Sequence, residues 1–318
     1  MPARIQNTLR LLGEQIQGLC VGGLSVWNSD QRAEWTWAKV IGSYEALPEP
    51  YWETLGSLLG GGRGFPYIVL TPAYDTFRTR VSEKLACVMD CEIHVLERSG
   101  KVVTTTCYPI ESIRYVEVSS ILLDYQVKIH GLTNQGVQAS SIFRCSAATD
   151  YLFTPVLRKI RMCGALQQGL TDVRDTAPFD PWYRLNFKFM NFARSSLLGG
   201  EKVVCAVLQP EIKVERFRIP GKTYYRTVFP THTCILTNRE LILIREEALQ
   251  DRKDKYGGIW DFIPLDKIAS LAVSSKNGHL LALCIRLLTN EEFECLFEEA
   301  AAKEVDELAV RFHELTSR

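Results

Sequence analysis

The sequence carries no excess of charge of either sign. Its 318 residues contain 37 Lys and Arg side chains and 37 Asp and Glu side chains. Proteins that bind nucleic acids or anionic membranes through their overall electrostatic field carry a net positive charge. The sequence therefore predicts no nucleic-acid partner, and any membrane contact would have to come from a local patch of cations.

A long apolar run is also missing. A membrane-spanning helix needs about 20 consecutive apolar residues, and the most apolar stretch, residues 280–288, already includes Arg286. Near the N-terminus, Glu14 and Gln17 interrupt the apolar residues that a signal peptide would keep together. We expect a cytoplasmic protein.

The cysteines are not clustered. The ten are spread along the chain, and most lie in apolar runs such as Val203–Val207, where a thiol packs like a small hydrophobic side chain. Free thiols in packed strands suit a reducing compartment. Only Cys87 and Cys91 lie close together, and without a second such pair we predict packing rather than a metal or redox site.

Recognisable catalytic motifs are absent. The five histidines stand singly, and neither a Gly-x-Ser-x-Gly nor a His-Glu-x-x-His sequence occurs. The glycine cluster Gly60–Gly64 precedes a strand-like stretch, whereas a phosphate-binding loop follows a strand and opens a helix. We therefore predict no enzyme, no cofactor and no metal. A cysteine-dependent enzyme, for example with Cys234 beside His232, is the weakest alternative.

The sequence contains a long internal repeat instead. Ser57–Gly61 recurs as Ser196–Gly200, and Val69–Pro72 recurs as Val207–Pro210. The order of these matches is the same in both halves. With 46% apolar and 10% aromatic residues, each half can bury a core of its own. Two related units are therefore predicted.

Basic residues belong to the same repeat. The pattern Arg-x-Arg followed by a lysine occurs in each half: Arg78, Arg80 and Lys84 in the first, and Arg216, Arg218 and Lys222 in the second. The second half then has an insertion of about nine residues, 223–231, after which Tyr108–Ile113 corresponds to Ile263–Ile268.

Within each half the hydrophobic period is mostly two, which is typical of strands. The strand-like stretches are residues 110–118, 122–129 and 137–143 in the first half, and 268–273, 280–288 and 293–297 in the second. Each half then changes to a helical period. Val305, Leu308, Phe312 and Leu315 make one apolar helix face, and in the first half a helix is expected to begin with Thr154 as its cap and Pro155 as its first residue.

Residues 1–49 lie outside the repeat. An amphipathic helix is predicted from Ile5 to Leu19, and a second helix over residues 31–44 with inward side chains. These inward side chains are Trp37, Val40, Ile41 and Tyr44. We expect this helical region to pack on the first unit; the alternative is a homo-oligomer formed through the N-terminal helix.

Two strands of the second half resemble a known family. Leu236–Ile244 and Trp260–Ile268 are similar to the paired strands of bacterial pleckstrin-homology-like and GRAM-type domains. The likeness covers about residues 198–315, and it reaches the first half only through the internal repeat. The resemblance implies a mainly β protein with α, built from two tandem partly open β-barrels, each capped by a C-terminal helix. The expected divisions are residues 1–49 for the helical region, 50–165 and 186–318 for the two domains, and 166–185 for the linker.

The resemblance also implies a ligand site, because basic residues of the first hairpin bind lipid headgroups in pleckstrin-homology domains. The candidates are Arg78, Arg80, Lys84, Arg216, Arg218 and Lys222. The alternative is that they are ordinary solvent-facing strand residues. Three cations near an anionic surface supply about 3 kcal/mol, which is a weak attraction.

Function is therefore predicted at the level of binding. The leading hypothesis is a non-catalytic scaffolding protein that mediates protein–protein interaction. The alternative is weak binding of an anionic lipid headgroup or a small anion, with peripheral contact to an anionic membrane. The acidic residues between Glu291 and Glu307 are interpreted as a solvated face, with docking of a basic partner as the alternative.

Overall fold

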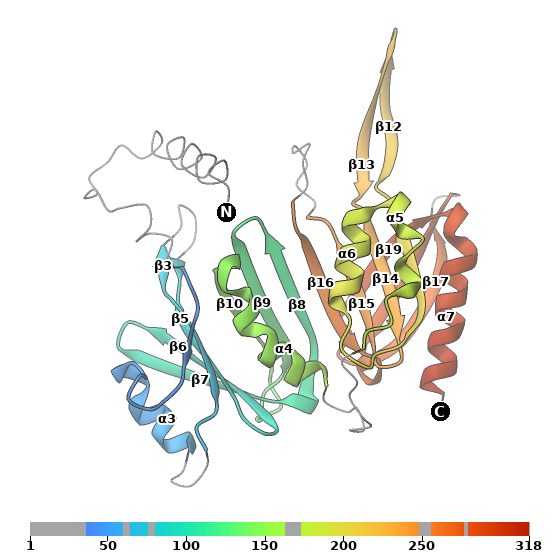
Figure 1. Cartoon of the computed structure of the whole chain (residues 1–318). Helices are drawn as coiled ribbons and strands as arrows, with labels where there is room; N and C mark the ends of the chain where they lie inside the picture. Colours follow the sequence, from blue (N-terminus) through green and yellow to red (C-terminus); the bar gives the residue numbers. More distant parts are fainter. Residues whose placement is uncertain are drawn as a thin grey trace.

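The computed structural model describes residues 36–59, 64–75, 80–162, 173–247, 256–276 and 279–317. Within these ranges the protein is mainly β, and strands of the two halves follow one another in the same order. Figure 1 shows the strands arranged in several sheets, with helices on their faces.

The first half of the chain contains two groups of strands. The first sheet has the order β1-β2-β5-β6-β7. Its strands are β1 (Lys39–Ile41), β2 (Tyr67–Thr71), β5 (Glu83–Val88), β6 (Glu92–Ser99) and β7 (Val102–Pro109). A short hairpin, β3 (Tyr74–Asp75) and β4 (Arg80–Val81), separates β2 from β5 in the sequence. The second group is β8 (Ile113–Ile121), β9 (Asp124–Leu132) and β10 (Gln138–Ser146).

The second half repeats this order. Its first group is β11 (Val203–Gln209), β14 (His232–Thr237), β15 (Glu240–Arg245) and β16 (Gly258–Pro264), and its second is β17 (Ile268–Lys276), β18 (Leu280–Leu287) and β19 (Glu292–Glu298). Between β11 and β14 stands the hairpin of β12 (Ile212–Ile219) and β13 (Lys222–Phe229). The strand-like stretches predicted from the period of two are confirmed in both halves.

One sheet joins the two halves. β8 of the first half pairs antiparallel with β16 of the second, from Gly258 opposite Ser120 to Phe262 opposite Val116. The result is a seven-stranded sheet of order β10-β9-β8-β16-β15-β14-β11. We call the β8–β16 pair the joint. None of the sheets in the described ranges closes into a barrel.

Helices cover these sheets. They are α3 (Trp52–Leu59), α4 (Thr154–Arg161), α5 (Trp182–Leu185), α6 (Phe187–Ser196) and α7 (Ala302–Thr316). Short 3-10 turns span Glu49–Tyr51, Ile110–Ser112, Ala147–Phe153, Ala177–Phe179, Leu265–Lys267 and Glu299–Ala301. In Figure 1, α4 and α6 lie over the seven-stranded sheet. No helix in the described part of the chain has the length and apolar character needed to cross a bilayer.

Two helix predictions can be compared with the structure. The C-terminal helix is confirmed, because Val305, Leu308 and Phe312 of α7 are buried. The cap predicted for α4 is one residue off: Thr154 is the first helical residue, and Phe153 precedes it. A 3-10 turn leads directly into α4, and the side chain of Ser146 caps that turn instead.

The hydrophobic core continues through the joint. α3 packs on the outer face of the first sheet, and α7 packs on strands of the second half. Between them, one cluster contains Val116, Val127 and Phe143 from the first half together with Phe189 and Ile242 from the second. The two repeats therefore share packed side chains as well as backbone hydrogen bonds.

The N-terminal prediction is wrong where it can be compared. Lys39–Ile41 form strand β1 on the edge of β2, in place of a helix, and the amide of Ala38 donates to Thr149 Oγ1 at 3.0 Å. Pairing with a sheet edge here overrides the helical spacing. Of the side chains predicted to face inward only Ile41 is buried, while Trp37, Val40 and Tyr44 are exposed. The helix predicted from Ile5 to Leu19 lies outside the described residues.

Candidate functional site

The hairpin of β12 and β13 extends away from the rest of the protein as a long two-stranded ribbon (Figure 1). Its base is fixed by Ile212, which packs against Ala282 and Leu296. Its tip turns at Gly221, whose φ of +79° suits glycine and is rarely adopted by other residues. In the first half, the described strands of the corresponding hairpin, β3 and β4, have two residues each, so the inserted residues of the second half lengthen this hairpin. We call β12 and β13 the ribbon.

The ribbon combines cations with exposed apolar side chains. Between Ile212 and Phe229 there are five cations and one carboxylate, Glu215, which gives a net charge of +4. The cations are Lys213, Arg216, Arg218, Lys222 and Arg226. Four apolar side chains of the same strands, Val214, Phe217, Ile219 and Tyr225, are 40% to 61% exposed. Apolar side chains gathered on one projecting element mark an interaction surface more often than scattered ones do.

One face of the ribbon is both aromatic and cationic. Phe217 lies opposite Tyr224, and their rings stack at 4.5 Å with planes 21° apart. The ammonium of Lys222 lies 4.8 Å from the centre of the Tyr224 ring. Because alternate residues of a strand share a face, Arg226 lies on this face too, opposite Val214.

Of the basic residues predicted in the first half, the structure describes Arg80 and Lys84, and these two lie on different strands. Arg78 lies outside the described residues, and Arg80 is exposed at the start of β4. Lys84 is mostly buried in β5, and its ammonium lies 3.2 Å from a carboxylate oxygen of Glu97. The charge of Lys84 is therefore already balanced within the protein.

The three basic residues predicted in the second half all lie on the ribbon. Arg218 donates to Glu215 at 2.8 Å but remains 70% exposed. The strand register shifts at Arg216, between the pairs formed by Glu215 and Phe217. Because of this shift, strand alternation does not place Arg216 on one face with Arg218.

Sequence reasoning missed two cations of the ribbon, Lys213 and Arg226. They fall outside the repeated Arg-x-Arg pattern, so comparison of the two halves could not single them out. A usable signal for Arg226 is the even spacing of Lys222, Tyr224 and Arg226 within a strand whose other residues carry no charge.

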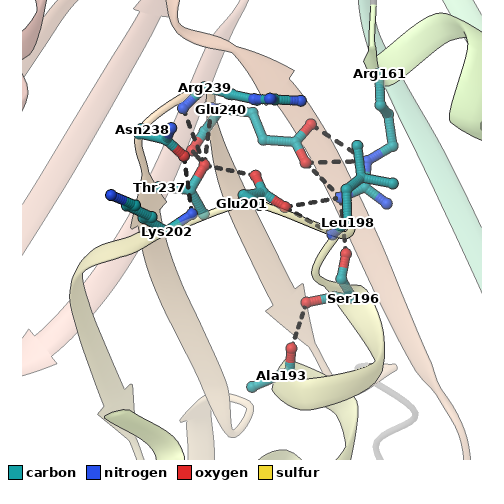
Figure 2. Close-up of polar contacts among 10 residues, drawn as sticks. All are labelled: Arg161, Ala193, Ser196, Leu198, Glu201, Lys202, Thr237, Asn238, Arg239 and Glu240. Carbon is teal, nitrogen blue, oxygen red and sulfur yellow. Dashed lines mark hydrogen bonds and ion pairs between the residues drawn. The ribbon is translucent and has the colours of Figure 1, made fainter. Parts of the chain in front are cut away.

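A buried polar network ties the two halves together (Figure 2). Arg161, at the end of α4, donates through Nε to Glu240 of β15 at 3.0 Å. Its Nη2 donates to the carbonyl of Ser196, at the end of α6, at 2.7 Å. The guanidinium also stacks 3.8 Å above the ring of Phe262 in β16. One side chain of the first half thus contacts three elements of the second.

A second carboxylate lies in the same network. Glu201 is fully buried, and it accepts hydrogen bonds from the amide of Leu198 at 2.8 Å and the hydroxyl of Thr237 at 2.6 Å. One of its oxygens lies 3.7 Å from Arg161 Nη2 (Figure 2). Two buried carboxylates therefore face a single guanidinium. Burial raises the pKa of Glu240 to about 7; Arg161 opposes this shift and Glu201 adds to it.

This pKa predicts a pH-dependent stability. The native state keeps a proton on Glu240 up to about pH 7, whereas the unfolded chain loses it near its ordinary value of 4.5. The native state thus binds more protons in this range, so the free energy of unfolding falls as pH rises from about 4.5 to 7, by about 3 kcal/mol.

We expect Glu240→Gln to remove this part of the pH dependence. Urea unfolding at a series of pH values measures it, as the difference between the curves of the variant and the natural protein. Glu53→Gln, which changes an exposed carboxylate on α3, is the control and leaves the curve unchanged. Parallel curves for Glu240→Gln and the natural protein would contradict the expectation.

The opposite face of the joint carries a further ion-pair cluster. Asp261 of β16 is fully buried, pairs with Arg245 and lies opposite Glu117 of β8. Glu117 in turn accepts from Lys128 of β9. Burial raises the pKa of Asp261 to about 6, while the charge of Arg245 lowers it. Asp261 and Phe262 are neighbours on one strand, so both faces of the joint are held by charged side chains.

One further cluster offers donor atoms of the kind that bind metals. His94 Nε2 lies 3.1 Å from a Glu92 oxygen and 3.9 Å from Cys107 Sγ. Glu92, His94 and Cys107 are the single group of three potential metal ligands in the described ranges. Oxygen, nitrogen and sulfur ligands of this kind suit Zn²⁺.

The same geometry does not suit a cysteine nucleophile. A catalytic triad places the nucleophile and the acid on opposite nitrogens of the imidazole. Here Cys107 and Glu92 both contact Nε2, while the buried Nδ1 of His94 has no hydrogen-bond partner among the described residues. Burial raises the pKa of Cys107 to about 11.

The pair Cys234 and His232 offers no better alternative. A hydrogen bond with Cys295, together with burial, raises the pKa of Cys234 well above its ordinary value. Burial lowers the pKa of His232 to about 4, and its ring packs against Phe229 and Phe297. Both groups therefore stay neutral near pH 7.

Comparison with known proteins identifies no relative: no family model matches this chain, and no curated protein matches it. Function must therefore be inferred from the geometry of the ribbon and of the joint.

Proposed function

We propose that this is a non-catalytic binding and scaffolding protein, which recruits a protein partner through the ribbon. One observation carries the proposal: a projecting element places five cations beside four exposed apolar side chains. Exposed cations direct the approach of a partner more than they strengthen the complex. The apolar side chains supply the area, and Phe217 and Tyr225 are of the type that dominates binding energy at interfaces. The partner that fits is a protein with an acidic surface around an apolar depression.

We also propose that both halves are pleckstrin-homology-like domains. In each half a group of four strands, a group of three strands and a helix follow in the same order, as the resemblance implies; the groups of four are β2, β5, β6 and β7 in the first half and β11, β14, β15 and β16 in the second, and β1 precedes the repeat. The free thiols of the eight described cysteines are in keeping with a cytoplasmic location, which belongs to the same proposal.

A photoreactive residue in place of Ile219, which is exposed and lies opposite Lys222 on the same face as Phe217, tests the recruitment of a protein. We expect it to form an adduct with one protein, which is then purified and titrated against the natural chain. Phe217→Ser and the double variant Arg216→Glu/Arg218→Glu should each weaken the affinity at least tenfold, since they remove the apolar anchor and reverse the local charge.

Lys39→Glu/Lys303→Glu is the matched control. It makes the same change in net charge at two exposed positions away from the ribbon, and it should leave the affinity unchanged. The proposal fails if no protein adduct forms at position 219, or if the purified partner binds the ribbon variants as tightly as the natural chain.

The charge of the ribbon also favours a second candidate, an anionic lipid surface. At about 1 kcal/mol for each unit of net positive charge close to such a surface, the net charge of +4 supplies about 4 kcal/mol, which corresponds to a dissociation constant of about 1 mM. Sedimentation with vesicles of phosphatidylserine and phosphatidylcholine, against phosphatidylcholine alone, measures this binding. Loss of sedimentation with Arg216→Glu/Arg218→Glu supports it, and equal sedimentation of that variant removes it. Competition by inorganic phosphate distinguishes a small-anion site from a surface effect.

A further inference from the structure

The internal repeat relates the joint to two strands that end their sheets. β16 corresponds to β7, because Glu240 lies opposite Pro264 as Glu92 lies opposite Pro109. β8 corresponds to β17, which likewise follows a 3-10 turn after a proline. Within the chain β8 and β16 pair with each other, whereas their counterparts β17 and β7 each form the end of a sheet. The edges of β8 and β16 are therefore paired within the chain, whereas the corresponding edges of β17 and β7 remain at the ends of two sheets.

Charged side chains, one of the usual protections of an edge strand, are almost absent from both of these strands. Natural edge strands carry charged side chains that discourage pairing with another chain. β7 has no charged residue between Val102 and Pro109, and β17 has only Lys276, at its last position. By contrast, β8, which is paired inside the sheet, carries Arg114 and Glu117.

We propose that copies of this chain assemble head to tail, with β17 of one copy pairing antiparallel with β7 of the next. The register follows from the joint. Ile259 lies opposite Ser119 there, and their counterparts are Thr104 and Ser274. Pairing then covers Val103 to Thr106. It ends there because the carbonyl of Cys107 already accepts a hydrogen bond from the amide of Asn134 at 3.0 Å.

The side chains suit such a contact. At the joint, Asp261 faces Glu117, and both are balanced by neighbouring cations. At the contact between copies the corresponding residues are Thr106 and Ala272, so no charge is buried. Valine and threonine are frequent in strands. The contact has four pairs instead of five and lacks the ion pairs, so it is weaker than the joint and depends on concentration.

A contact of this kind joins two different surfaces of the same molecule. Such heterologous contacts produce a closed ring, or an open filament if the rotation does not close. The assembly depends on the two strand edges and not on the ribbon, so it stands or fails independently of the proposed partner.

Analytical ultracentrifugation of the full chain from about 1 to 200 μM tests the assembly. The natural protein is expected to grow beyond its 36.1 kDa monomer as concentration rises. Thr104→Asp/Ser274→Asp places two like charges opposite each other and should hold the protein at the monomer mass. Thr104→Lys/Ser274→Asp places opposite charges at the same two exposed positions and should restore the larger species.

Ser57→Asp/Ser317→Asp adds the same charge at exposed positions away from both edges, and it should assemble like the natural protein. Two results would overturn the proposal. One is a natural chain that stays monomeric throughout the range. The other is a Thr104→Asp/Ser274→Asp variant that assembles as the natural chain does, since a different surface would then hold the copies together.

Discussion

Arg161→Met is expected to lower the free energy of unfolding by about 3–5 kcal/mol, which urea unfolding at pH 8 measures. The substitution keeps much of the side-chain volume above Phe262 but removes the guanidinium that pairs with both Glu201 and Glu240. Two buried carboxylates are then left without a counter-charge. The loss should shrink toward pH 5, where the native state already holds a proton on Glu240.

Arg158→Met is the matched control for this prediction. Arg158 lies one turn earlier on α4 and is exposed, so its loss should change stability by less than about 0.5 kcal/mol. Adding Glu240→Gln to Arg161→Met should recover part of the stability, because it removes one of the unbalanced charges. Equal losses for Arg161→Met and Arg158→Met would show that the network contributes little to the fold.

Arg161 links the two repeats, so its loss should also affect how firmly the repeats are held together. Arg161 belongs to the first repeat, and its partners Ser196 and Glu240 belong to the second. Under the scaffolding function proposed above, motion between the repeats would spread the ribbon over many positions relative to the first half. The buried charges at the joint hold the first repeat against the repeat that carries the ribbon.

Local patterns were sufficient to predict most strands and the last helix. β18 was expected from residues 280–288 and spans Leu280–Leu287, and α7 carries its apolar face as the spacing indicated. These elements follow from side-chain period, which depends on the local sequence alone. The repeated order of strands was predictable for the same reason, since it needed only a comparison of the two halves.

The contacts that join the halves had no such local signal. Pairing of β8 with β16 brings together residues more than 130 positions apart, and nothing in either strand specifies the other. An aspartate in a strand is normally expected to face solvent. Asp261 is buried instead, and it forms an ion pair with Arg245 of the neighbouring strand. On the ribbon, the insertion indicated where the hairpin lengthens, but the register shift at Arg216 could be seen only in three dimensions.

Gly257→Ala is expected to destabilise the protein by about 2 kcal/mol or more, through the joint. Gly257 precedes β16 and has a φ of +79°, a conformation that costs other residues about 1–2 kcal/mol. A Cβ atom there would also overlap the carbonyl oxygen of Ser120 and lie 2.8 Å from the Cα of Ile121. Both contacts are to backbone, so the two strands would have to separate.

Gly136→Ala separates the cost of the positive φ from the cost of the close backbone contact. Gly136 has a similar φ of +74° in the turn after β9, but a Cβ atom there meets nothing within 4 Å. It should therefore show only the conformational cost of about 1–2 kcal/mol. Hydrogen exchange supplies the second measurement: amides of residues 116–120 and 258–262 should exchange faster in Gly257→Ala alone. If both variants lose the same stability and these amides stay protected, the close approach of Gly257 to Ser120 does not hold the joint together.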